Sequence, residues 1–169
     1  LGAMVADAIR EYTNADIAVQ NTGGVRADIA PGEVTRRDCL SVLPFGNQMV
    51  VATVKGEFVR RLLEQKVGQW GVGLFVSGLT IEYNTSRPQG DRILSIKVGD
   101  QPLNPAGDYK IAMTNFLSEG NSGMTLMREV PEDAFLYTGT TDREALEHYF
   151  QKHSPFTPKN VARWVQVNS

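Results

Sequence analysis

The sequence predicts an α+β fold in which a mixed β-sheet packs against helices. Helical periodicity occurs early, in the middle and late in the chain, and the β-branched runs that predict strands cluster between these helices. Turns that contain glycine or proline separate the strands. No repeat, low-complexity tract or linker divides residues 1–169, so we expect them to form a single domain.

The first predicted helix starts with the sequence itself. Residues 1–10 carry apolar side chains at helical spacing, and no capping residue precedes them. Because an uncapped helix start is unfavourable, we expect the sequence to begin inside a larger protein. A native N-terminus with a frayed helix is the alternative.

Two strands and two helices are predicted in the following part of the chain. Residues 17–20 read as a short buried strand that runs into a glycine-containing turn at residues 21–26. A short helix is expected from Thr35, and the β-branched run at residues 49–54 predicts the next strand. Residues 56–67 have an apolar stripe opposite charged residues, which is typical of an amphipathic packing helix.

Three further strands are expected at residues 79–83, 93–98 and 109–113. The segments that separate them, residues 86–91 and 104–108, have strong turn compositions. This hairpin-like spacing implies antiparallel pairing in part of the sheet.

The last predicted helix begins with a capping box. Thr141 and Glu144 have the spacing in which each side chain bonds the backbone N–H of the other residue. The helix is expected to continue to about His153, where prolines follow and end it.

Composition excludes several classes of partner. A net charge of -2 and a pI near 5.7 provide no broad basic face, so no nucleic-acid partner is expected. No apolar run approaches the roughly 20 residues of a membrane span. The single cysteine, Cys39, permits no intrachain disulfide and does not indicate a redox compartment.

The residues needed for hydrolysis at a metal centre are too few. Only two histidines occur, His148 and His153, and they lack the spacing of metal ligands, so solvated helix positions are the simpler interpretation. Cys39 has no histidine near it in sequence to activate it, so it is expected to be structural. The glycine patterns of dinucleotide-binding and P-loop proteins are also missing. We therefore predict no catalytic and no metal-binding residue in this chain.

Three polar or aromatic stretches in connections remain as candidate binding loops, at residues 21–26, 43–47 and 114–124. In the first, glycines allow close backbone approach to a ligand and Arg26 offers a planar fork to phosphate oxygens, although a tight turn with a surface arginine fits equally well. In the second, core packing is the simpler interpretation of Phe45. Phe45 and Phe116, from separate loops, have the chemistry to sandwich a nucleobase.

These stretches, in this order and spacing, resemble the C-terminal domain of the 5'-nucleotidase family, which includes bacterial UDP-sugar hydrolases and animal ecto-5'-nucleotidase. The similarity runs from about Gly2 to Met124. It is carried by three motifs, Asn21-x-Gly23-Gly24-x-Arg26, Leu43-Pro44-Phe45-Gly46-Asn47 and Asn115-Phe116-Leu117 with its following glycine loop.

The resemblance implies a role for each site residue. Phe45 and Phe116 would stack on the two faces of the base, and Arg26 would contact the phosphate or ribose. Asn21, with Gly23 and Gly24, would lie beside the nucleoside, while Asn47 and the backbone near Gly71 would meet the base edge. Ser122 stands where the family usually has an aspartate that holds the ribose hydroxyls. The family's further arginine before the first helix lies outside this sequence.

For the full-length protein, the resemblance implies a 5'-nucleotidase-type phosphoric monoester hydrolase. Two divalent metal ions would be bound by an N-terminal metallophosphoesterase domain that this chain lacks, and the chain alone would bind a nucleotide or nucleoside without hydrolysing it. A periplasmic, secreted or cell-surface location is implied as well. The alternatives are a 2',3'-cyclic-nucleotide phosphodiesterase or UDP-sugar hydrolase with the same architecture, or a non-catalytic interaction module.

Overall fold

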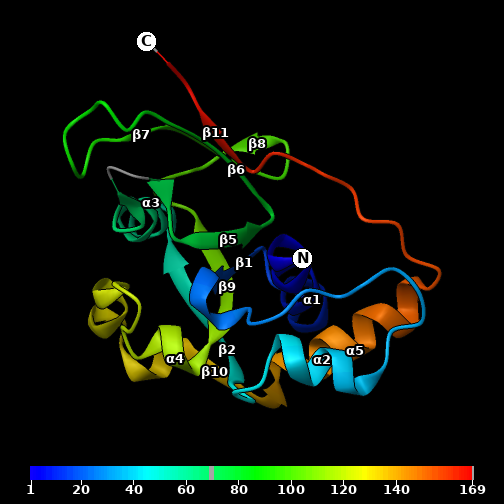
Figure 1. Ribbon diagram of the computed structural model, residues 1–169. Helices are drawn as coiled ribbons and strands as arrows, with labels where there is room; N and C mark the ends of the chain where they lie inside the picture. Colours follow the sequence, from blue (N-terminus) through cyan, green and yellow to red (C-terminus); the bar gives the residue numbers. More distant parts are fainter. Residues whose placement is uncertain (69–70, 169) are drawn as a thin grey trace.

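A computed structural model describes residues 1–68 and 71–168 and has the predicted α+β architecture (Figure 1). The central five-stranded sheet consists, in spatial order, of β10 (Phe135–Thr141), β2 (Gln48–Lys55), β9 (Asp108–Thr114), β1 (Ile17–Asn21) and β5 (Leu74–Ser77). The four-stranded sheet consists of β11 (Trp164–Gln166), β6 (Leu79–Tyr83), β7 (Ile93–Val98) and β8 (Gln101–Pro102). Short strands β3 (Val67–Gly68) and β4 (Gly71–Val72) pair with each other.

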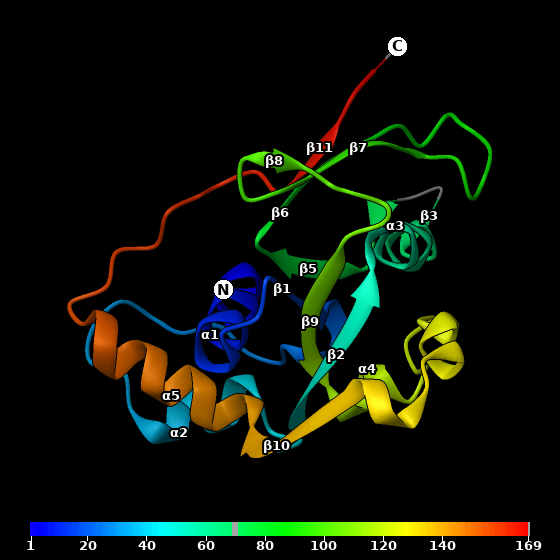
Figure 2. The same cartoon turned by 180° about the vertical axis from the view of Figure 1, so that it is seen from behind.

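Helices cover both faces of the central sheet. The α-helices are α1 (Gly2–Thr13), α2 (Arg36–Val42), α3 (Gly56–Glu64), α4 (Asn115–Ser118) and α5 (Asp142–His153). Three short 3-10 helices are η1 (Thr22–Gly24), η2 (Thr125–Glu129) and η3 (Glu132–Ala134). Figures 1 and 2 show α1, α2 and α5 grouped on one side of the sheet, with α3 and the second sheet on the other. None of the helices among the described residues is long and apolar enough to cross a membrane.

Alternation along the strands divides the core into two clusters. Val19 and Ile111 belong to the cluster that includes α3 and strands of the second sheet. Their neighbours Ala18 and Ala112 belong to the cluster that includes α1, α2 and α5. Successive side chains of a strand point to opposite faces, so a sheet covered on both sides buries side chains at every position. The fully buried pattern of β1 follows from this arrangement.

Strand direction determines where the loops meet. β1 runs parallel to β9, and both pair with antiparallel neighbours, β5 and β2 respectively. The last residues of β1 and β9 therefore lie at the same edge of the sheet as the first residues of β5 and β2. The register confirms this, because Asn21 pairs with Leu74 and Met49 pairs with Thr114.

Three expectations from the sequence need correction. The helix predicted at residues 56–67 ends at Glu64, because Val67 pairs with Val72 in the β3–β4 hairpin. The hairpin between residues 79–83 and 93–98 is confirmed, but β7 and β9 lie in different sheets, so the turn at residues 104–108 joins no hairpin between them. The strands consequently form two main sheets.

The C-terminal segment returns from α5 to the second sheet. There β11 pairs in parallel with β6, and the Trp164 indole N–H donates to Leu74 O at 2.9 Å. Arg163 donates to Asp7 Oδ2 at 2.6 Å and to Val76 O at 2.7 Å. These bonds fasten the end of the chain to α1 and β5.

Candidate functional site

The three candidate stretches converge at one edge of the central sheet. Arg26 N donates to Val42 O at 2.9 Å, which joins the first stretch to the helix that leads into the second. Gln48 N donates to Asn115 Oδ1 at 3.0 Å, which joins the second stretch to the third. In Figure 1 the connection after β1, the loop between α2 and β2, and α4 lie toward this edge. Segments far apart in sequence thus form one continuous surface.

The second glycine of the first stretch lies close to the side chains at the end of β1. η1 begins directly after β1, where Asn21 is buried. A Cβ atom on Gly24 would overlap the Gln20 amide nitrogen and would lie 3.0 Å from Asn21 Oδ1. A side chain at position 24 would therefore require the Gln20 amide to move, whereas Gly23 is exposed.

Arg26 is exposed and weakly held. Its guanidinium makes one bond, from Nη1 to Gly23 O at 3.4 Å, and none of the ion pairs among the described residues involves it. Arg26 is thus a surface arginine in a tight turn, and such a residue can also contact an anion. The structure therefore fits both interpretations of the motif.

The second stretch presents its aromatic ring to solvent. Phe45 is 62% exposed, so core packing, which was the simpler interpretation, is wrong. Gly46 has a φ of +61°, which supports the sharp change of direction before Asn47. Asn47 is partly exposed, and its carbonyl accepts a hydrogen bond of 2.9 Å from Asp142 N at the start of α5. The loop is therefore anchored on one side while the Phe45 ring is left uncovered.

The third stretch places a second exposed ring at the neighbouring strand end. Phe116 is 39% exposed and follows β9 within α4. The Asn121 side chain donates to Phe116 O at 2.9 Å and so ties the glycine loop to the helix. Because β2 and β9 are paired at this end, Phe45 and Phe116 emerge from adjacent positions of the sheet edge.

The glycine loop turns through left-handed backbone conformations. Gly120 and Gly123 have φ values of +87° and +77°, and Ser122 adopts 55°, which is uncommon for a residue with a side chain. Lys66 Nζ donates to the Ser122 carbonyl and lies 3.5 Å from Ser122 Oγ. Burial lowers the pKa of the Lys66 ammonium.

Gly71 opens β4 with a φ of +125°, and nothing lies within 4 Å of where its Cβ would stand. Its neighbour Gly73 connects this segment to the site. Gly73 O accepts from Thr22 N at 3.4 Å, and Gly73 N donates to Lys66 O at 3.3 Å. The segment that contains Gly71 is therefore linked to the first stretch and, through Lys66, to the glycine loop.

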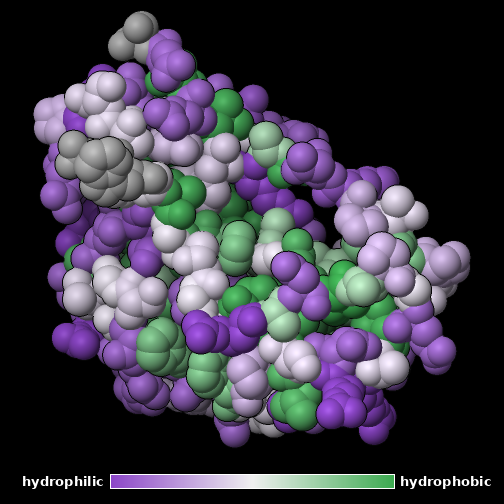
Figure 3. Space-filling model, viewed as in Figure 1, coloured by the Kyte–Doolittle hydropathy of each residue, from purple (hydrophilic) through white to green (hydrophobic). Residues whose placement is uncertain are grey.

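Apolar residues are visible on the face of the molecule seen in Figure 3. Figure 3 shows apolar residues in the middle of the view with polar residues around them. Phe45 and Phe116 are two of the large apolar side chains that remain exposed. An exposed aromatic pair with a cation at the same sheet edge suits a planar ligand that carries charge.

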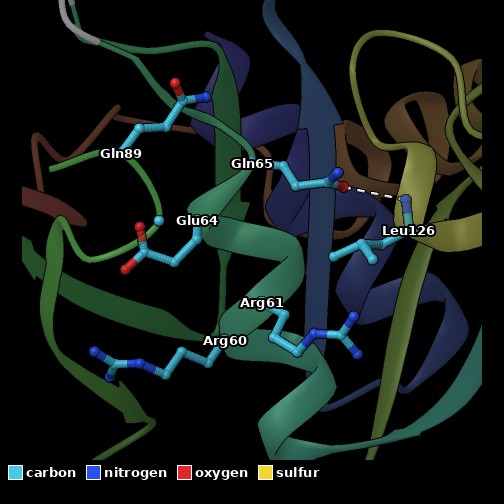
Figure 4. A pocket seen from close by; sticks show the side chains of 7 residues that line it. Arg60, Arg61, Glu64, Gln65, Gln89 and Leu126 are labelled. Carbon is cyan, nitrogen blue, oxygen red and sulfur yellow. Dashed lines mark hydrogen bonds between the residues drawn. The ribbon is translucent and has the colours of Figure 1, made fainter.

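Two surface hollows lie outside these loops. One, of about 330 Å³, is lined by Arg60, Arg61, Glu64, Gln65, Gln89, Gly90 and Leu126 (Figure 4). In it the Gln65 amide oxygen accepts a bond from Leu126 N at 3.1 Å, and the two arginine side chains extend away from each other. The second, of about 480 Å³, lies between α3 and the second sheet. Neither contains a predicted site residue.

Cys39 and the two histidines, for which the sequence predicted no chemical role, lie on α2 and α5. Cys39 is buried, and burial raises the pKa of its thiol. His148 is exposed beside the Tyr12 ring. His153 was expected to be solvated but lies 2.8 Å from Glu11 Oε2, where it links α5 to α1. Within residues 1–68 and 71–168, no three His, Cys, Asp or Glu side chains form a group that fits a metal ion.

Several polar residues beneath the loops received no role from the sequence, including Thr114, the first residue of the third stretch. Gln20 and Thr114 are fully buried at the ends of β1 and β9, and neither side chain has a hydrogen-bond partner among the described residues. Asp142 is 2% exposed under the second stretch, and burial raises the pKa of its carboxyl to about 6. Polar residues next to the motifs were the available signal, but burial becomes visible only in the fold.

An α+β domain with its candidate loops gathered at one sheet edge defines a class of ligand-binding module. Among known families, residues 1–129 match the family model described as 5'-nucleotidase, C-terminal domain. The chain therefore belongs to the 5'-nucleotidase C-terminal domain family, as the sequence motifs predicted.

Relatives and solved structures agree. Protein UshA of Yersinia enterocolitica is 33% identical over 92% of this chain and 28% of its own length. A 5'-nucleotidase precursor from Thermus thermophilus superposes with a TM-score of 0.89 at 32% identity, covering 99% of this chain and 35% of that chain. The NAD nucleotidase of Haemophilus influenzae superposes with a TM-score of 0.85 at 25% identity. This match covers 99% of this chain and 33% of that chain. The chain thus spans only about a third or less of these proteins.

Proposed function

We propose that this domain binds the base of a nucleotide between Phe45 and Phe116 and presents its phosphate to a metal-bearing domain of the same protein. The observation that carries the proposal is the pair of exposed rings at the ends of paired strands β2 and β9. Exposed aromatic side chains stack on bases without reading their identity. The rings lie among residues that match the family model.

The other site residues surround the rings in this proposal. Arg26 meets the phosphate, and Asn21 with the backbone of Gly23 and Gly24 lies beside the nucleoside. Arg26 is suited to this role because it is exposed and carries only a weak internal bond. We further propose that Asn47 and the backbone near Gly71 meet the base edge, and that Ser122 faces the ribose.

We assign hydrolysis to the N-terminal metallophosphoesterase domain of the full-length protein, which would hold two divalent metal ions. The described residues of this chain do not fit such a centre, because no group of three ligand side chains converges. This domain would then supply binding and positioning, which accelerate a reaction by holding the reacting group in place. The chain by itself would bind nucleotides and leave them intact. We also propose a periplasmic, secreted or cell-surface location.

The decisive experiment is a titration of the chain with adenosine, followed through the ring resonances of Phe45 and Phe116. Saturable shifts of both rings are expected, since a stacked base perturbs each ring directly. The buried Ile96 methyl, on β7 in the second sheet, serves as an internal control that should not shift. Absence of saturable change at both rings would reject the base-binding role and favour an interaction module.

A second candidate is the same role in a 2',3'-cyclic-nucleotide phosphodiesterase or a UDP-sugar hydrolase. One relative supports this second candidate. It is the trifunctional nucleotide phosphoesterase YfkN of Bacillus subtilis, which is 32% identical over 99% of this chain. Steady-state rates of the full-length protein with 5'-AMP, 2',3'-cyclic AMP and UDP-glucose distinguish these activities.

A further inference from the structure

Lys66 lies where the first and third stretches meet. Its ammonium bonds the Ser122 carbonyl and lies 3.5 Å from Ser122 Oγ. It would also stand 3.5 Å from a Cβ on Gly73 and 3.9 Å from one on Gly123. Because Gly73 O in turn accepts from Thr22 N at 3.4 Å, Lys66 bridges the glycine loop to the connection after β1.

The Lys66 ammonium has no acidic partner among the described residues. Lys55 and Lys152 pair with Asp108 and Glu11 at 2.8 Å, but none of the ion pairs of residues 1–68 and 71–168 involves Lys66. Desolvation is the cause that lowers the pKa of Lys66. A partly buried cation without a counter-charge is unfavourable, and an incoming anion would remove that penalty.

Hydrogen-bond capacity also remains at this position. An ammonium has three N–H donors, and Ser122 O and Oγ account for two of them. The Ser122 hydroxyl adds a further donor that can rotate. Lys66 and Ser122 therefore offer donors and positive charge, which suits a phosphate better than a neutral ribose hydroxyl.

We propose that Lys66, together with the Ser122 hydroxyl, is a specificity-determining site for nucleotides that carry phosphate on the 2' or 3' position of the ribose, including 2',3'-cyclic phosphates. This inference rests on the proposed function, in which the base stacks on Phe45 and Phe116 and Ser122 faces the sugar. In that function Arg26, whose Nη1 bonds Gly23 O, serves the 5'-phosphate.

The test is calorimetric titration of the 169-residue chain with adenosine, 5'-AMP, 3'-AMP and 2',3'-cyclic AMP. Lys66→Met should lower the affinity for 3'-AMP and 2',3'-cyclic AMP by roughly tenfold or more, as expected for the loss of a charge-assisted bond. The affinities for adenosine and 5'-AMP should stay within about twofold. Lys66→Arg should restore most of the lost affinity. Lys97→Met, which removes an exposed cation from β7, is the matched control and should change none of the four.

Lys66→Gln covers the case in which the methionine variant fails to fold, because an amide still donates to Ser122 O but carries no charge. An equal loss for all four ligands would show that Lys66 only holds the loop, and a loss confined to 5'-AMP would place it at the 5'-phosphate. Unchanged affinity for the 3'-nucleotides would likewise overturn the inference. If the unmodified chain binds none of the four ligands, the proposed function itself fails, which is a distinct outcome.

Discussion

Phe45→Ala should remove most nucleoside affinity and little stability. The Phe45 side chain is 62% exposed, so less than half of its surface is shielded in the folded domain. Full burial of a phenylalanine contributes about 1.5–3 kcal/mol, so truncation of this ring should lower the free energy of unfolding by about 1 kcal/mol or less. Loss of base stacking costs about 1–3 kcal/mol per base. Binding should therefore suffer more than folding.

The measurement pairs adenosine calorimetry with urea unfolding of the same preparations. A loss of about 1–3 kcal/mol corresponds to a rise of roughly 5- to 150-fold in Kd. Phe116→Ala should behave in the same way, with a somewhat larger stability loss because Phe116 is 39% exposed. Leu94→Ala is the matched control, since Leu94 is also 39% exposed but lies on β7 in the second sheet.

Phe45 has no base-stacking role of this kind if Phe45→Ala leaves Kd unchanged, or if it lowers stability as much as a core truncation of about 2–5 kcal/mol. The first result would mean that the ring does not touch the ligand. The second would mean that the ring is covered in solution, contrary to its exposure in the fold.

Three further changes test the site and its support. Arg26→Ala should weaken AMP more than adenosine, because the charge-assisted bond needs a phosphate; equal losses in calorimetry would move Arg26 to the ribose. Ser122→Asp should widen the preference for ribose over 2'-deoxyribose by on the order of 1 kcal/mol, since an ionised acceptor bonds hydroxyls more strongly; an unchanged affinity ratio of adenosine to deoxyadenosine would contradict it. Asp142 favours its protonated form in the fold, so its contribution is greatest below pH 3.8 and is lost as pH rises through about 6. Asp142→Asn should therefore raise the free energy of unfolding at pH 7.5 by up to about 3 kcal/mol and flatten its dependence on pH between 3.8 and about 6 in urea titrations; an unchanged profile would show that the carboxylate is solvated.

Local signals in the sequence were sufficient to predict the helices and the hairpin that depend on contacts between residues close in sequence. The capping box of Thr141 and Glu144 opens α5 as predicted, and Thr35 caps α2 through Asp38 in the same way. The first predicted hairpin also forms, with β6 and β7 paired antiparallel and connected by residues 84–92. Signals of this kind depend on residues within one or two turns of each other, so tertiary contacts seldom override them.

Pairing between distant strands was not visible in the same way. β9 follows β8 closely in sequence yet lies between β1 and β2, and β10 pairs with β2 from a distance of more than 80 residues. The strand β5 was not predicted, although its four residues are largely buried. Such placements depend on which faces the helices cover, and a period-2 pattern does not specify its partner strand.

The division between structural and binding positions within the motifs also required the fold. The motifs contain both buried residues, such as Asn21 and Leu117, and exposed ones, such as Arg26 and Phe45. The sequence does not distinguish the two kinds of position, because glycines, amides and aromatic rings occur both in tight turns and in ligand-binding loops. Burial separates them, since a side chain that already packs against the sheet edge shapes the loop, whereas an exposed ring or cation still has surface to offer a ligand. Lys66 extends the same argument beyond the motifs. It is 56 residues from Ser122 in sequence, and only the folded glycine loop brings its charge to the site.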